Sequence, residues 1–89
     1  MIVTGVTRSG FNFKVDTEAM NDMEFVDALS DTMDDNPIAF SKVCTKLLGS
    51  EQKKELYNHL RKDGKVTIES VGEEIADIFG AIGEEGKNS

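Results

Sequence analysis

The order of apolar and polar residues predicts a short β-hairpin at the start of the chain. Residues 11–15 alternate strictly, with two phenylalanines and a valine on one face, and this period of two is typical of a β-strand. An apolar run at residues 2–6 precedes it, and the connection ends in Ser9-Gly10, which suits a turn with one residue at positive φ. Because an isolated hairpin is marginal in water, we expect its aromatic face to pack on the rest of the chain.

Beyond the hairpin, apolar residues recur at the three- and four-residue spacing of helices. The first predicted helix lies within residues 16–35. Asn21 is its expected cap, and Glu24 is the reciprocal partner of a capping box. Its apolar stripe consists of Met23, Phe25, Val26, Ala28, Leu29 and Met33.

The next two predicted helices have their ends marked in the sequence. Asn36 is the expected cap of the second helix, and Pro37 occupies its first helical position, where the missing N–H costs nothing. Gly49 supplies a left-handed stop, and Ser50 then caps the third helix. The turn at residues 63–64 ends this third helix.

The last predicted helix has the most regular apolar spacing in the chain. Thr67 is its expected cap and Gly83 its expected end. Gly72 and Gly80 lie inside it, each costing about 1 kcal/mol relative to alanine, so we expect close packing against a neighbour there. Residues 84–89 are polar and are predicted to form a disordered tail.

Together these elements predict a mainly α fold, a small four-helix array with an N-terminal β-hairpin, which is α+β at the margin. At 89 residues the chain forms one domain, residues 1–83 with the hairpin in 1–15, followed by the tail. Its 38% hydrophobic and 30% charged residues are typical of a soluble protein. No apolar run approaches the roughly 20 residues of a membrane span, and the single Cys44 favours a reducing cytoplasm.

The distribution of charge says more than the net charge of −7. Residues 1–40 carry two bases and eight acids, net −6; residues 41–65 carry seven bases and three acids, net +4; residues 66–89 carry one base and six acids, net −5. The overall charge disfavours nucleic-acid binding. A basic middle would steer identical subunits together, although mixed surface charge for solubility explains it equally well. The candidate residues for such self-association are Lys53, Lys54, Arg61 and Lys62.

Side chains that carry chemistry are few. His59 is the only histidine, which we expect to be partly exposed, and Cys44 is expected to be a buried thiol. Residues 31–36 are rich in carboxylates, but they lack the glycine and the terminal glutamate of a calcium loop. No glycine pattern suits a phosphate. We therefore predict that the protein is not an enzyme and uses no cofactor and no metal.

Several segments carry a resemblance to a known family. They are Asp22–Leu29, Asn36–Ala39, Leu47–Gln52, Leu56–Leu60 and Asp63–Val66. In these segments the chain resembles the tail assembly chaperones of long-tailed phages and prophages of Gram-positive bacteria. The likeness covers about residues 10–89 and rests on helical residues and turns.

The resemblance implies a non-virion protein of the host bacterial cytoplasm, encoded by a siphophage or prophage. It would bind and solubilise the tape measure protein until tail tube subunits polymerise around that protein and displace the chaperone. Its implied partners are the tape measure protein, further copies of itself as a homo-oligomer, a frameshift-extended form of itself and the tail tube protein. Neither nucleic acid nor a membrane is among them.

A tape measure is a long apolar helical chain that would aggregate if uncovered, and helix-in-groove contacts would cover it. We chose candidate contact residues from the apolar pattern alone, which does not separate a binding face from the core. They are Phe25, Leu29, Phe40, Leu47, Leu56, Tyr57, Ile75 and Phe79.

A second hypothesis from another functional class is an acidic DNA mimic that inhibits a host nuclease or regulator. Mimicry requires a continuous acidic stripe, and the bases at 53–54 and 61–62 interrupt it. The neighbouring genes discriminate the two hypotheses, because a tail tube gene upstream and a very long tape measure gene downstream support the chaperone.

Overall fold

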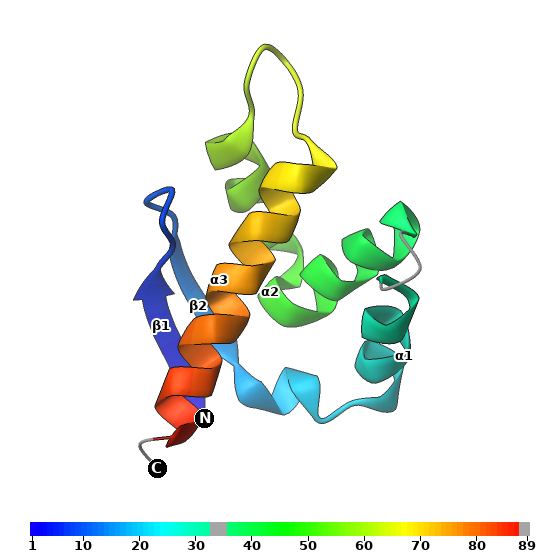
Figure 1. The fold of residues 1–89 in the computed structure, drawn as a ribbon, viewed down its shortest axis with the longest axis vertical. Helices are drawn as coiled ribbons and strands as arrows, with labels where there is room; N and C mark the ends of the chain where they lie inside the picture. The colour runs from blue at the N-terminus through cyan, green and yellow to red at the C-terminus, as the bar shows by residue number, and fades with distance from the viewer. Residues whose placement is uncertain (33–35, 88–89) are drawn as a thin grey trace.

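The computed structural model describes residues 1–32 and 36–87, with the backbone alone for 84–87. It has a mainly α fold with an N-terminal antiparallel hairpin, as the sequence predicts (Figure 1). Its elements in chain order are β1 (Ile2–Val6), β2 (Asn12–Asp16), a 3₁₀ helix η1 (Thr17–Met20), α1 (Met23–Thr32), α2 (Pro37–Leu60) and α3 (Ile68–Lys87). No helix in the described part of the chain is both long and apolar enough to cross a membrane.

The hairpin packs one face of its two strands against the helices. Thr4 lies opposite Lys14 and Gly5 lies opposite Phe13. The ring of Phe13, which is buried, lies against Gly5, where a Cβ atom would come within 2.8 Å of the ring. A side chain at this position of β1 would have to displace the buried ring of Phe13. The predicted positive φ in the turn is confirmed at Gly10, where φ is +92°.

Helix α1 begins one residue later than the sequence predicts. The chain leaves β2 through η1, whose C-terminal cap is Asn21, so Asn21 does not cap α1. Asp22 takes that role: its Oδ1 accepts a hydrogen bond from the backbone N–H of Glu24 at 2.9 Å. This bond, with a smaller contribution from Lys46, lowers the pKa of Asp22 below its ordinary value. Met33, the last residue of the predicted stripe, lies outside the described residues.

Helix α2 contains two helical segments, because its backbone is not helical at Gly49 (φ +82°, ψ +161°). Figure 1 shows the two segments, residues 37–48 and 50–60, running in different directions. The predicted cap is confirmed, since Asn36 Oδ1 accepts from the N–H of Ile38 at 3.1 Å. With α1 and α3, the four predicted helical segments are all present.

A tight turn separates α2 from α3 and projects from one end of the molecule (Figure 1). Lys62 and Lys65 exchange backbone hydrogen bonds of 2.9 and 3.1 Å around it. Asp63 and Gly64 both have positive φ, 54° and 78°, as the central residues of a type I′ turn require.

Helix α3 starts where the sequence predicts and ends later. Thr67 Oγ1 accepts from the N–H of Ser70 at 3.2 Å and so caps the first turn. The predicted stop at Gly83 is wrong, because the helix continues to Lys87. Gly83 is not among the glycines at positive φ, so it costs helix propensity without ending the helix. Residues 84–87 of the predicted disordered tail are thus helical, and 88–89 lie outside the described residues.

The core lies where α1, both segments of α2, α3 and one face of the hairpin meet. Its buried members are Val3, Phe11, Phe13, Val15, Phe25, Ala28, Val43, Cys44, Leu47, Leu48, Leu56, Val71, Ile75 and Ile78. Cys44 is fully buried, as expected, and burial raises the pKa of its thiol. A reactive thiolate at this position is therefore disfavoured.

Candidate partner-binding surfaces

Four of the eight apolar contact residues suggested by the sequence belong to the core. They are Phe25, Leu47, Leu56 and Ile75, and each is buried. A partner could reach them only if the domain opened. These four residues therefore stabilise the fold, and they do not form a surface in the folded chain.

The other four candidates are half-buried, and two of them line a cleft at the surface. Leu29 and Phe79 pack against the core, and the ring of Phe79 meets that of Phe25 edge to face at 6.4 Å. Phe40 and Tyr57 lie together in a cleft of about 140 Å³. The structure thus brings together one residue from each segment of α2.

We name this site the Phe40–Tyr57 cleft. The start of α3 forms one of its sides. Its lining consists of Pro37, Phe40, Ser41, Tyr57, Val66, Thr67, Ile68 and Val71. A Cβ atom at Gly72 would lie 3.8 Å from Phe40 Cζ, an ordinary contact, so Gly72 packs against this ring. Gly80 has no such neighbour, and the close packing predicted there is absent from the described structure.

The size of the cleft suits one apolar side chain. An apolar cavity of about 150 Å³ accommodates a benzene-sized group. Ile68 is on its rim and is 57% exposed, which leaves an apolar surface continuous with the opening. This arrangement could hold a single leucine or phenylalanine from a partner helix.

Lys53 joins the two segments of α2 beside this cleft. Its ammonium group donates to Ser41 Oγ at 2.8 Å and to Thr45 Oγ1 at 2.9 Å, and it lies 5.6 Å from the centre of the Tyr57 ring. Burial raises the pKa of the Tyr57 hydroxyl above its ordinary value, so the ring stays neutral near pH 7. Lys53 is therefore engaged within the chain.

The three other basic residues proposed for self-association are exposed. Lys54 lies on the second segment of α2, and Arg61 and Lys62 lead into the projecting turn. None of the three forms an ion pair within the described part of the chain. These three residues therefore differ from Lys53, which is engaged within the chain.

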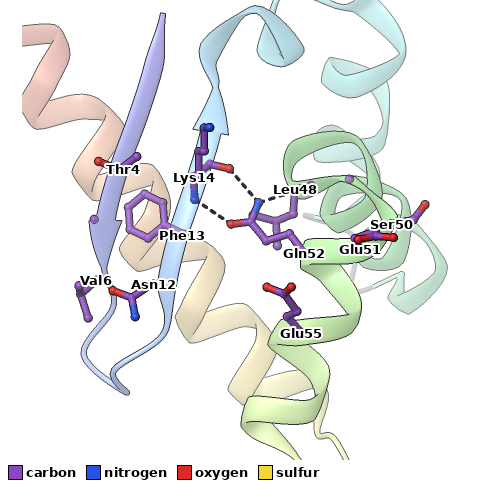
Figure 2. Close-up of a pocket in the computed structure, with 12 residues that line it drawn as sticks. Thr4, Val6, Asn12, Phe13, Lys14, Leu48, Ser50, Glu51, Gln52 and Glu55 are labelled. Atoms are coloured by element: carbon purple, nitrogen blue, oxygen red, sulfur yellow. Dashed lines mark hydrogen bonds between the residues drawn. The ribbon is translucent and has the colours of Figure 1, made fainter.

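A larger, open groove of about 800 Å³ lies between the hairpin and the break in α2 (Figure 2). Its lining is Thr4, Gly5, Val6, Asn12, Phe13, Lys14, Leu48, Gly49, Ser50, Glu51, Gln52 and Glu55. The amide of Gln52 accepts from the N–H of Lys14 at 2.7 Å and donates to its carbonyl oxygen at 2.8 Å. Figure 2 shows these two bonds, through which a side chain of α2 occupies the outer edge of β2.

A polar cluster that the sequence did not predict fixes the tip of the hairpin to α2 and α3. Glu74 is 3% exposed and accepts hydrogen bonds from Thr7 Oγ1, at 3.1 Å, and from Ser9 Oγ. His59 is exposed, as the sequence predicts, and its Nε2 lies 3.1 Å from the Ser9 carbonyl oxygen. The same nitrogen lies 3.0 Å from Ser9 Oγ, so both contacts join His59 to the tip of the hairpin.

The cluster contains a serine, a histidine and a carboxylate, but not in the order of a catalytic triad. In a triad the carboxylate orients the histidine, and the histidine takes the proton of the serine. Here the carboxylate of Glu74 contacts Ser9 directly, and among the described residues no carboxylate contacts His59 to orient it. The geometry supports attachment of the hairpin, not nucleophilic catalysis.

Among known proteins, no family model, curated sequence or solved structure matches this chain.

Proposed function

We propose that this chain is a tail assembly chaperone that covers the tape measure protein of a long-tailed phage or prophage until the tail tube forms. The resemblance of its helices and turns to that family supports the proposal. So does the Phe40–Tyr57 cleft, which is the observation on which the proposal depends. A small helical domain with an apolar cleft beside exposed Ile68 suits the apolar face of a helix.

The size of the cleft predicts weak binding by each copy. Burying one leucine or phenylalanine side chain contributes about 1.5–3 kcal/mol, whereas a dissociation constant of 1 mM already corresponds to about 4 kcal/mol. One cleft alone therefore holds a tape measure only transiently. Many copies along one long chain raise the total affinity, and each remains easy for tube subunits to displace.

The alternative, an acidic DNA mimic, is less well supported by the surface. Arg61, Lys62 and Lys65 are exposed at the projecting turn, where they place positive charge. This positive charge would repel the basic surface of a DNA-binding protein, so it disfavours mimicry of a phosphate backbone. The alternative predicts binding to a basic protein that is lost as salt rises.

The test of the proposal uses a matched pair of substitutions. Ile68 and Met23 are both the first residue of a helix and both more than half exposed. We expect Ile68→Asp to weaken binding to a helical segment of the downstream tape measure protein by about tenfold, since it places a charge at the cleft. Met23→Asp should change binding less than twofold.

Fluorescence anisotropy of the labelled tape measure segment measures both affinities. Circular dichroism checks that both variants remain folded, and an acidic residue is favourable in either first helical turn. Equal affinities of the two variants would show that the Phe40–Tyr57 cleft is not the binding site.

A further inference from the structure

The outer edge of β1 carries backbone groups that point away from the hairpin. In an antiparallel pair, alternate residues direct both their N–H and their C=O toward the neighbouring strand. Lys14 directs its two groups outward to Gln52, so its partner Thr4 also directs its groups outward. By the same alternation, Ile2 and Val6 also direct their backbone N–H and C=O groups outward. Within the described chain these three residues have no backbone hydrogen-bond partner on that side.

The outer edges of β1 and β2 differ in whether a side chain bonds their backbone groups. The outer edge of β2 is occupied at its centre by the Gln52 amide. Among the described residues, no group bonds the outer edge of β1, and β1 lacks the charged residues or proline by which natural edge strands avoid pairing. Moreover, Ile2 and Val6 are 52% and 63% exposed. An uncharged, apolar, uncovered strand is a template for another strand.

We propose that β1 pairs with β1 of a second copy, antiparallel and centred on Thr4, to form one four-stranded sheet. This register places Thr4 opposite the partner copy's Thr4 and Ile2 opposite its Val6. All of these residues direct their backbone groups outward, so three cross-strand pairs each exchange both N–H···O bonds. Both exposed apolar side chains then become cross-strand neighbours, which stabilises the pair.

The symmetry of β1 favours a second copy as the occupant. Ile2 and Val6 lie two residues on either side of Thr4, so the outer edge of β1 is complementary to itself in the antiparallel direction. The pairing uses the same strand on both copies, so it is isologous and closes as a dimer. Gln52 hinders further growth at β2, which distinguishes this dimer from an open β-aggregate.

This dimer does not depend on tape measure binding, and it differs from assembly steered by the basic residues of α2. Hydrogen bonds and apolar contacts hold the paired strands, so the dimer should persist at high salt. Charge-steered assembly should weaken as salt rises. Sedimentation velocity at low and high salt separates the two modes.

Disulfide trapping tests the register. Residues directly opposite in such a pair have Cα atoms about 5.5 Å apart, within the range of a disulfide. We expect Thr4→Cys to give a covalent dimer under mild oxidation, while the native Cys44 is buried and stays unreactive. Asn12→Cys is the control, because this exposed residue of β2 lies one strand farther from the interface. Equal cross-linking of the two variants would overturn the register.

Charge substitutions at the exposed Ile2 and Val6 provide a second test. With lysine at both positions, like charges face each other across the interface, and the dimer dissociation constant should rise at least about tenfold. With Ile2→Glu and Val6→Lys, opposite charges face each other, and dimerisation should recover. A wild-type chain that sediments as a monomer at every concentration, or two double variants with the same dissociation constant, would refute the proposal.

Discussion

At the scale of single residues, the contact between Gly5 and Phe13 shows how one missing side chain positions another. The ring of Phe13 fills the space above Gly5 and closes the inner face of the hairpin. At the tip of the hairpin, Glu74 positions Thr7 and Ser9 by accepting hydrogen bonds from their hydroxyls. These residues attach the hairpin to the helices through a shape fit and a polar cluster.

We predict opposite effects of alanine at two glycines. Gly5→Ala should destabilise the fold by about 1–3 kcal/mol, because the new Cβ would displace the buried ring of Phe13. Gly80→Ala should stabilise it by up to about 1 kcal/mol, since Gly80 is helical and no atom crowds its Cβ position. Urea unfolding measures both free energies of unfolding. If Gly5→Ala left the free energy of unfolding unchanged, the ring of Phe13 would have moved aside without loss of stability.

Residue types alone predicted part of this picture. The alternation of Phe11, Phe13 and Val15 identified the buried face of the hairpin correctly. Glu74 was not recognised, because a glutamate at the edge of a helical stripe normally lies in solvent. The signal was its position between Val71 and Ile78, on the buried side of α3. Its hydroxyl partners come from a distant turn, so the sequence could not reveal them.

At the scale of elements, the break in α2 gives the domain its shape. Gly49 allows the two segments to point in different directions, and Lys53 then links them through Ser41 and Thr45. The Phe40–Tyr57 cleft forms between these segments and α3. The break therefore determines whether the candidate binding surface exists.

Substitution of Gly49 tests this dependence. Its φ and ψ lie in a region that residues with a side chain seldom adopt, so Gly49→Ala should cost about 1–3 kcal/mol of unfolding free energy. Ser50→Ala should change it by less than about 0.5 kcal/mol, because the capping hydrogen bond predicted for Ser50 is absent from the described structure. Thermal unfolding compares the two. If both variants match the wild type, the break is not held by Gly49.

Helix ends were predictable where one local residue determines them. Asn36 and Thr67 cap α2 and α3 as the sequence indicates. Asn21 was assigned wrongly because the chain continues from β2 into η1, which takes Asn21 as its own cap. Gly83 was assigned wrongly because a glycine ends a helix only when it adopts positive φ, which its residue type permits but does not require.

At the scale of the whole molecule, the apolar pattern did not distinguish core from surface. Phe25 and Phe40 both belong to the apolar pattern of their helices, yet Phe25 is buried and Phe40 lines a cleft. The difference arises from the angle between the segments of α2 and from where α3 crosses them. Tertiary packing sets both, and no single stripe contains that information.

The tape measure proposal depends on the distinction between core and surface residues. Only surface residues, such as Phe40 and Tyr57 in the cleft, can bind a partner while the domain is folded. The most direct test is co-expression with a tape measure fragment that is insoluble on its own, followed by measurement of its soluble fraction. We predict that the wild-type chain keeps most of the fragment soluble and co-elutes with it, that Met23→Asp does the same, and that Ile68→Asp does so poorly. A fragment that remains insoluble with the wild-type chain, with no complex on elution, would contradict the account.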